Sequence, residues 1–466
     1  MLTTPIYYAN AEPHIGTLYT TLAVDYVSRL INRPYTTGLD EHGKKIAQTA
    51  EKNSLTPQEH VDLMADKFER IFYRFDCHPY RFIRTTDPDH ELAVIDFWNR
   101  LKDNGHIYLG TYRGYYSVRE ESFFSESELI DGKTPQGTDV ELIEQPSYFF
   151  RLSAFKEKLL EIYNSGFIDT YRKNEIIYIV NNHLEDLSVS RVDVDWGIGV
   201  PNDPNHTIYV WIDALVNYLT VCGYPENGWE EKWRDTIHVV GKDIAKFHAI
   251  YWPALLMAAD IPLPSSIITH GWLLDSKEKK VSKSEGNSNP VDELADIYGT
   301  DAIRYALLAE VSFGQDGIVD DNVFDRRYSI LSNSYGNLVN RISRVLIKQS
   351  FSLTLPSQDA INLIDRFDLC AIDSIGNCRK WNINRSVENL LEIPSLLNAY
   401  VGEIRFWENS ESFSDILYLL WSVSDYLEPL LPEKTKIVKT WITDSLDKCN
   451  FEPTYSLCLL FPRING

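Results

Sequence analysis

A helical pattern of apolar residues stands near the start of the chain. Between residues 15 and 30, apolar side chains recur three and four positions apart and form one stripe, made of Ile15, Leu18, Tyr19, Leu22, Tyr26, Val27 and Leu30. Pro13 suits the first turn of such a helix, where its missing N–H costs nothing. We therefore expect His14 and Gly16 in the first turn, where free N–H groups and the helix dipole favour an anion. The stretch is either a nucleotide site, in which Gly16 lets a ring or a phosphate approach the backbone, or a helix start with a structural histidine.

Short apolar runs later in the chain predict the strands of a parallel sheet. They cover residues 207–211, 237–240 and 266–269, and helical segments follow the first two, which gives the order β-α-β-α-β. Residues 106–151 interrupt this pattern, since they are rich in aromatic residues and glycine and read as short strands. We expect an α/β fold, a doubly wound parallel (Rossmann-like) sheet split by a β-rich insertion. From about residue 323 the pattern is helical and predicts a C-terminal all-α bundle.

Composition narrows the class of protein. A chain of 466 residues should hold several domains, and 44% hydrophobic and 24% charged residues are ordinary for a soluble globular protein. No apolar run approaches the roughly 20 residues of a membrane helix, and we see no secretory signal, so we expect a cytoplasmic protein. The net charge of −22 argues against non-specific nucleic-acid binding, although a local basic surface could still hold one shaped RNA. The six cysteines are scattered without a CxxC pair, which argues against a disulfide framework and a cysteine-based zinc site.

Polar clusters follow several of the predicted strands. Asp40 lies in TGLDEHG, while WIDALVNY starts at Trp211 and GKDIAKFH starts at Gly241. Ligands bind beyond the carboxyl ends of parallel strands, so these segments are candidate site loops; for the cluster at Asp40 a helix cap is the alternative. Residues 276–289 carry four lysines and form either a cationic clamp on a polyphosphate or a solvated charged loop.

The combination of His14-Ile15-Gly16-Thr17 with Lys280-Val281-Ser282-Lys283-Ser284 resembles the class I aminoacyl-tRNA synthetases. The segments PIYYANAEPHIG, TGLDEHG, YFFRLS, EDLSVSR, DWGIGVP, YVWIDALVNYL, GKDIAKFHAIYWPALL and GNLVNR narrow the resemblance to the methionyl-tRNA synthetases, over essentially the whole chain. The resemblance implies activation of L-methionine by ATP to methionyl-adenylate and pyrophosphate. It also implies transfer of methionine to the 3′ end of tRNA(Met), including the initiator.

The same resemblance assigns roles to residues of this chain. The implied methionine pocket comprises Pro5, Ile6, Tyr8, Asp40, Trp211, Ala214, Tyr218 and His248, with Asp40 binding the substrate ammonium. The implied catalytic residues are His14, Thr17, Lys280 and Lys283. The implied ATP site, with Mg²⁺ accompanying the nucleotide, comprises His14, Gly16, Thr17, Gly241, Asp243 and Lys283. The implied anticodon readers are Asn337, Arg341 and Trp407; the first two lie four apart on one helix face, and for a tryptophan on a helical segment a core role is the alternative.

These roles give an expected domain division. Residues 1–105 and 206–274 would form the catalytic domain, and residues 106–205 the inserted connective domain. Residues 275–325 would hold the lysine loop and contact the tRNA stem, and residues 326–466 would form the helical anticodon-binding domain.

This chain departs from the pattern of the methionyl-tRNA synthetases at four points, which bear on activity, the early strands, zinc and oligomeric state. Thr17 stands where the family usually has a second histidine, and a threonine cannot carry charge, so we expect slower activity. Val281 replaces the usual methionine, a mild change. Only residues 31–36 separate the first helix from the Asp40 loop and two residues precede Thr3, so we expect two short or frayed strands and a looser Asp40. No cysteine lies between Cys77 and Cys222 and the chain ends just past the bundle, so we expect no zinc and a monomer.

The sequence leaves two other functions open. One is a class I synthetase for another apolar amino acid, and the other is a non-catalytic tRNA-binding paralogue. Amino-acid-dependent exchange of pyrophosphate into ATP separates them, because it is driven by methionine, by another amino acid, or by none.

Overall fold

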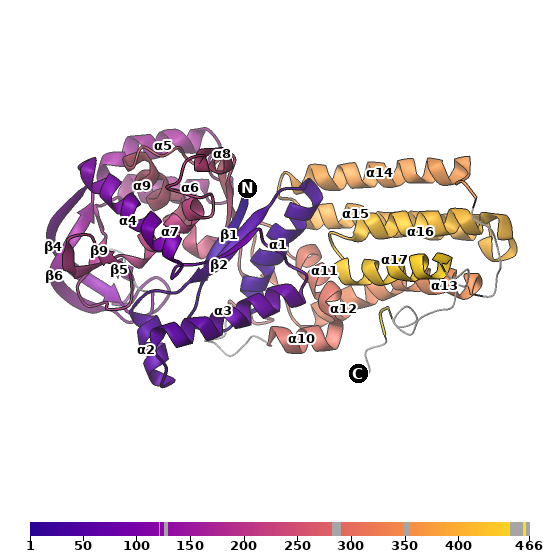
Figure 1. The fold of residues 1–466 in the computed structure, drawn as a ribbon, viewed down its shortest axis with the longest axis horizontal. Coiled ribbons are helices and arrows are strands. Elements are labelled where there is room, and N and C mark those ends of the chain that lie inside the picture. The colour runs from indigo at the N-terminus through magenta and orange to yellow at the C-terminus, as the bar shows by residue number, and fades with distance from the viewer. Residues whose placement is uncertain (121, 125–128, 282–289, 348–353, 448–459, 463–466) are drawn as a thin grey trace. The chain divides into compact units, whose positions relative to one another are not determined.

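The computed structural model describes residues 1–120, 122–124, 129–281, 290–347, 354–447 and 460–462. Their contacts divide the chain into two compact units (Figure 1). The first unit comprises Met1–Pro13, Pro34–Arg70 and Pro79–His270, and the second comprises His14–Arg33, Ile71–His78 and Gly271–Gly466. No helix in the described ranges is long and apolar enough to cross a membrane.

A five-stranded parallel sheet forms the centre of the first unit, in the order β12-β11-β1-β2-β3. Its strands are β1 (Leu2–Tyr8), β2 (Tyr35–Asp40), β3 (Arg81–Arg84), β11 (Ile237–Gly241) and β12 (Ser266–His270). The register between β1 and β2 shifts between Thr3 and Ile6. Pro5 lies in this gap, and because it has no N–H it removes one bond of the ladder. The doubly wound parallel sheet expected from the sequence is confirmed.

Two expectations about the strands are wrong. Residues 207–211 are not a parallel strand, because β10 (Asp203–Ile208) pairs antiparallel with β8 (Ser190–Arg191) and β9 (Gly199–Val200) and a helix begins at Val210. A short apolar run cannot be told from the start of a buried helix by periodicity alone. The early strands are not frayed either. Leu2 is fully buried, its N–H donates to Pro34 O at 2.9 Å, and all of β2 before its last residue is buried.

The insertion between the strands of the parallel sheet is β-rich, as expected. Its main antiparallel sheet has the order β5-β4-β6-β7, built from β4 (Ile107–Ser117), β5 (Ser122–Phe124), β6 (Glu141–Phe150) and β7 (Leu187–Ser188). The helices of the first unit are α2 (Lys44–Lys52), α4 (Pro88–Asp103), α5 (Lys156–Asn164), α6 (Lys173–Asn182), α7 (Val210–Thr220), α8 (Trp229–Trp233) and α9 (Trp252–Ala258), while α3 (Pro57–Arg74) crosses the boundary between the units. Apolar residues of α4, α7 and α9, including Trp98, Leu215 and Trp252, share one core with the insertion.

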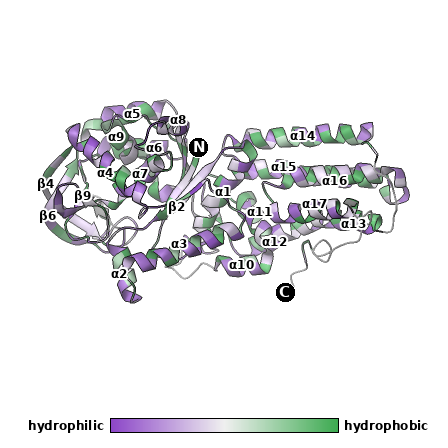
Figure 2. Ribbon diagram, in the orientation of Figure 1, coloured by the Kyte–Doolittle hydropathy of each residue, from purple (hydrophilic) through white to green (hydrophobic). Residues whose placement is uncertain are grey.

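The second unit is helical. It contains α1 (Ile15–Ile31), α10 (Val291–Tyr298), α11 (Thr300–Glu310), α12 (Asp321–Leu331), α13 (Asn337–Leu346), α14 (Gln358–Cys378), α15 (Ile383–Glu403), α16 (Phe413–Leu427) and α17 (Pro432–Asp447), with the short strands β13 (Leu273–Leu274) and β14 (Gly317–Ile318). Figure 2 shows that its long helices carry hydrophobic and hydrophilic stripes, which is how amphipathic helices bury one face in a bundle. The C-terminal helical bundle predicted from the sequence is confirmed.

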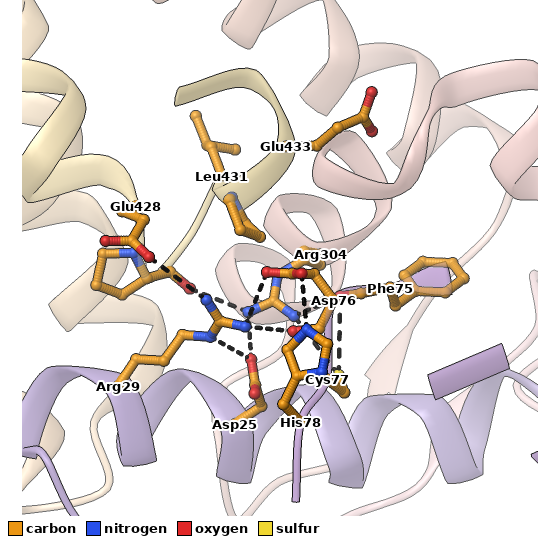
Figure 3. A network of polar contacts seen from close by, with 12 residues as sticks. Asp25, Arg29, Phe75, Asp76, Cys77, His78, Arg304, Glu428, Leu431 and Glu433 are labelled. Atoms are coloured by element: carbon orange, nitrogen blue, oxygen red, sulfur yellow. Dashed lines mark hydrogen bonds and ion pairs between the residues drawn. The ribbon is translucent and has the colours of Figure 1, made fainter. Parts of the chain in front are cut away.

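A buried ion pair fastens α1 inside this second unit (Figure 3). Arg304 of α11 is fully buried, and its Nη2 lies 2.6 Å from the Asp25 carboxylate of α1. The same guanidinium donates to Phe75 O at 2.9 Å and to Pro429 O at 3.0 Å. Arg29, one turn after Asp25, donates to the same carboxylate at 2.9 Å. The helix that begins at His14 is therefore held to α11 by a charge-assisted bond, and Arg304 joins both to Phe75 and Pro429.

Candidate functional site

Aromatic rings surround a buried histidine in the first unit. The Tyr218 hydroxyl on α7 lies 2.7 Å from His248 Nε2, and His248 Nδ1 lies 3.0 Å from Ile244 O. A carbonyl only accepts, so Nδ1 carries the hydrogen and Nε2 accepts from Tyr218. Burial lowers the pKa of His248 to about 4. Both rings are therefore neutral near pH 7.

Trp211 completes this group of rings. It stacks on Phe247 with ring centroids 3.5 Å apart and meets His248 edge-on at 6.4 Å. Phe247 and His248 begin a π-helical turn, Phe247–Tyr251, just before α9. Ala214, one turn along α7 from Trp211, is buried. The result is an apolar, polarisable and uncharged surface, which suits a thioether side chain.

A second histidine packs against the Tyr218 ring. His238 on β11 is fully buried, and its ring centroid lies 4.0 Å from that of Tyr218. Trp252 Nε1 donates to His238 Nε2 at 3.2 Å, so Nδ1 donates to Thr3 Oγ1 at 2.9 Å. Burial lowers the pKa of His238 well below its usual value. Sequence reasoning missed Phe247 and His238, although Phe247 lies inside the segment GKDIAKFH and adjoins His248.

The loop that carries Asp40 begins at the carboxyl end of the parallel sheet. Asp40 ends β2 in register with Tyr8, the last residue of β1, and its carbonyl accepts from Ala9 N at 2.9 Å. Pro5 is buried, and Ile6 and Tyr8 are half-buried. The Lys45 ammonium lies 5.8 Å from the centroid of the Tyr8 ring. The structure thus places Tyr8 and Asp40 side by side on adjacent strands. The family resemblance implied that both residues line the same pocket.

The residue after Asp40 anchors this loop. Glu41 is fully buried, and its carboxylate accepts from Arg84 Nε at 2.7 Å and from the Thr86 hydroxyl. Its backbone is held as well, because Thr85 Oγ1 accepts from Glu41 N at 2.9 Å and Trp196 Nε1 donates to Glu41 O. Burial raises the pKa of Glu41 despite the nearby Arg84.

A buried carboxylate joins the Asp40 loop to α7. Asp213 contacts His42 Nδ1 at 2.7 Å with one oxygen and His90 Nε2 at 2.8 Å with the other. Burial acts to raise the pKa of Asp213, but the two histidines outweigh it and lower that pKa to about 2. Burial acts to lower the pKa of His42, and Asp213 outweighs it in turn and raises that pKa. The segments DEHG and WIDA contain His42 and Asp213, yet their sequence contained no signal that the two side chains pair.

In the second unit, His14 starts helix α1. It is the N-cap rather than a residue of the first turn, and Pro13 precedes the cap, which corrects the expected start of this helix. His14 Nδ1 accepts from Gly16 N at 3.1 Å. Thr17 Oγ1 accepts from His14 N at 3.0 Å and donates to His14 O at 2.7 Å. A Cβ at Gly16 would lie 2.9 Å from His14 Cε1, so the ring that approaches Gly16 in this structure is that of His14.

The remaining candidates for ATP binding belong to both units. Gly241 ends β11, and an added Cβ there would lie 2.6 Å from an Asp243 carboxylate oxygen, so a larger residue would displace that carboxylate. In the second unit, the exposed Lys280 lies 4.9 Å from the centroid of the Trp272 ring. Val281 is buried and its N–H donates to Leu273 O at 2.8 Å, which places an apolar side chain inward beside Lys280. Lys283 lies outside the described residues.

Two of the expected anticodon readers meet on the helical bundle. The Arg341 guanidinium lies 5.9 Å from the centroid of the Trp407 ring, and its Nη1 donates to Asn398 Oδ1 at 2.6 Å. Trp407 lies in the 3₁₀ turn Phe406–Glu408 rather than on a long helix, and it is 44% exposed, so it is not a core residue. Asn337 is exposed at the start of α13, four residues before Arg341. A π-helical turn, Ser332–Gly336, joins α12 to α13 just before Asn337.

No group of three or more histidine, cysteine, aspartate or glutamate side chains in the described part of the chain is arranged to hold a metal ion. The cysteines that the structure describes, Cys77, Cys222, Cys370 and Cys378, are free thiols.

Comparison with known proteins places the chain in a family. The family model described as tRNA synthetases class I (M) matches residues 1–140 and 135–343. A methionine--tRNA ligase of Rickettsia felis is 42% identical over 458 residues, which is 92% of this chain and 89% of that protein. A methionine--tRNA ligase of Listeria monocytogenes is 40% identical over 438 residues, which is 87% of this chain and 65% of that protein. The structure of Mycobacterium tuberculosis methionyl-tRNA synthetase in complex with methionyl-adenylate superposes with a TM-score of 0.87 at 34% identity, covering 99% of both chains.

Proposed function

This chain belongs to the methionine-type class I tRNA synthetases, and we propose that it joins L-methionine to tRNA(Met) in two steps driven by ATP. The observation that carries the proposal is the set of neutral rings formed by Trp211, Tyr218 and His248. A charged or strongly hydrated pocket would not accept the methionine side chain, whereas this one combines polarisable rings with the buried Tyr218 hydroxyl.

The pocket would contact both the thioether side chain and the ammonium group of methionine. We assign the thioether to Trp211, Tyr218 and His248, with Ala214 leaving room for an unbranched chain. Asp40, beside Tyr8, would receive the substrate ammonium, and the buried contacts of Glu41 support its loop. Pro5 and Ile6 would line the pocket from β1. Because each methylene contributes only about 1–3 kcal/mol of discrimination, close packing of the aromatic rings is what would exclude shorter apolar amino acids.

The first step forms methionyl-adenylate. A methionine carboxylate oxygen attacks the α-phosphorus of ATP, and the bond from that phosphorus to the bridging oxygen of the β-phosphate breaks, so pyrophosphate leaves with the electron pair. His14 would donate to the phosphates, while Lys280 and Lys283 would stabilise the charge that grows on pyrophosphate. Gly241 and Asp243 would bind the adenosine, and Mg²⁺ would arrive with ATP as part of the substrate.

The second step transfers methionine to RNA. A hydroxyl of the terminal ribose attacks the activated carbonyl carbon, the bond from that carbon to the phosphate oxygen breaks, and AMP leaves with the electron pair while the hydroxyl proton passes to the released phosphate or to water. Asn337, Arg341 and Trp407 would select tRNA(Met), initiator included, by stacking on and bonding to unpaired anticodon bases. The cation–π contact between Arg341 and Trp407 supports this assignment, because it presents a planar cation and an exposed ring together.

We infer that the enzyme works as a cytoplasmic monomer. We also infer that it needs no zinc, because no cysteine lies between Cys77 and Cys222. Elemental analysis of the purified protein tests this, and stoichiometric zinc would contradict it. We also propose that residues 1–105 and 206–274 form the catalytic domain, residues 106–205 the connective domain, residues 275–325 the lysine-loop region and residues 326–466 the anticodon-binding domain.

Exchange of labelled pyrophosphate into ATP tests the function. We expect methionine to drive exchange, with leucine, isoleucine and valine far weaker, and we expect the protein to charge tRNA(Met). Exchange driven better by another apolar amino acid would identify a different synthetase. Absence of exchange with tRNA binding retained would identify a non-catalytic paralogue.

A further inference from the structure

Thr17 holds the backbone of His14 from both sides. Its Oγ1 accepts the His14 N–H at 3.0 Å and donates its own hydrogen to the His14 carbonyl at 2.7 Å. Together with the bond from Gly16 to the His14 ring, these contacts form a capping box at the start of α1. The hydroxyl hydrogen of Thr17 is thereby directed at the protein backbone.

The same cap determines which ring nitrogen of His14 carries the hydrogen. Nδ1 accepts from Gly16 N at 3.1 Å, so in the neutral imidazole the hydrogen lies on Nε2. The absence of a side chain at Gly16 lets the ring lie this close, since a Cβ there would come within 2.9 Å of Cε1. His14 is half-buried, and Nε2–H is the donor that the proposed function directs to a phosphate oxygen.

We infer that Thr17 is a positioning residue, which acts on ATP through His14 and does not itself contact the phosphates. This replaces the direct role that the sequence resemblance implied for Thr17. The inference rests on the proposed function, because it concerns how the same site presents His14 to ATP. In this chain the position that usually carries a second histidine serves to orient the first one.

Three variants of helix α1 test the inference. Thr17→Val keeps the shape of the side chain but removes the hydroxyl, whereas Thr17→Ser keeps the hydroxyl. Thr21→Val is the matched control, since it removes a threonine hydroxyl one turn further along the same helix, where Thr21 Oγ1 donates to Thr17 O at 3.1 Å, and leaves the Thr17 hydroxyl in place. We expect Thr17→Val to lower kcat/KM for ATP about tenfold in methionine-dependent pyrophosphate exchange, with the KM for methionine unchanged. Thr17→Ser and Thr21→Val should stay close to the unmodified enzyme.

A spectroscopic readout separates positioning from mere stability. Nitrogen NMR of labelled histidine, with the His14 signal assigned by its loss in His14→Gln, should report hydrogen on Nε2 in the unmodified protein and in Thr17→Ser. In Thr17→Val we expect a mixture of tautomers at a temperature where the variant is folded.

Three results would overturn the inference. One is unchanged kcat/KM for ATP in Thr17→Val, and another is a Thr17→Ser variant as impaired as Thr17→Val. If Thr21→Val loses as much activity as Thr17→Val, the effect comes from a weaker helix and the inference is again wrong. A lack of methionine-dependent exchange in the unmodified protein would instead refute the proposed function.

Discussion

The Tyr218 hydroxyl donates to His248 Nε2 across 2.7 Å, and His248 in turn donates to Ile244 O across 3.0 Å. This chain of bonds makes His248 an acceptor toward Tyr218 and keeps it uncharged. Tyr218→Phe should therefore leave a buried acceptor without its donor, at a cost of about 1–3 kcal/mol in unfolding free energy. We expect the KM for methionine to rise about tenfold in pyrophosphate exchange, since the substrate also loses the hydroxyl.

Tyr224→Phe is the control for this prediction. Tyr224 is buried in the same unit and its hydroxyl donates to Asp96, away from the rings around His248. It should lower stability while the KM for methionine stays unchanged. An equal rise of that KM in both variants would show that the Tyr218 effect is a general loss of stability.

Burial of neutral His248 predicts a dependence of stability on pH. The pKa of His248 is lowered by burial from 6.5 to about 4, so between these values the unfolded chain binds a proton that the folded protein does not. Stability therefore falls as pH falls from 6.5 towards 4, and at pH 5 the contribution of His248 is about 2 kcal/mol. Urea unfolding at pH 7 and pH 5 measures it. The His248→Gln variant should lose about 2 kcal/mol less than the unmodified protein between these pH values, and equal losses would contradict the assignment.

Arg84 should stabilise the loop that carries Asp40. Its guanidinium neutralises the fully buried Glu41, so Arg84→Ala leaves a buried carboxylate without its cation and should lower the unfolding free energy by about 3 kcal/mol. The KM for methionine should rise as well, because Glu41 adjoins Asp40. Arg81→Ala is the matched control. Arg81 pairs with the exposed Asp89 and should cost less than about 1 kcal/mol, with the KM unchanged.

Substitutions at Arg341 and Trp407 should impair the charging of tRNA and leave the activation of methionine by ATP unchanged. Loss of one stacked base contact costs about 1–3 kcal/mol, so Arg341→Ala and Trp407→Ala should each lower kcat/KM for tRNA about 5- to 150-fold. Pyrophosphate exchange should be unaffected in both variants. Arg385→Ala, an exposed arginine of the same bundle that pairs with Glu388, should leave charging unchanged. A decrease in exchange that matches the decrease in charging would place Arg341 and Trp407 outside anticodon recognition.

The sequence predicted much of the fold, but not every strand. The apolar runs before Gly241 and His270 form β11 and β12 as expected, because buried parallel strands are apolar on both faces. The run that ends at Trp211 was assigned to the same sheet and instead joins an antiparallel strand to a helix. Short apolar runs are compatible with either state, and only the partners that bury them decide between the two.

By itself, the sequence determined the periodicity of α1, the apolar runs that form β11 and β12, and the motifs that contain Tyr218, His248 and Asp40. Each of these depends on neighbouring residues or on motif spacing. Only the tertiary structure decided the charge on His248, the pairing of Asp213 with His42 and the capping role of Thr17. The first two depend on burial and on partners far away in the chain, which remove water and leave a few bonds to set each protonation state. The third depends on backbone geometry at the helix start, which brings the Thr17 hydroxyl onto the N–H and C=O of His14.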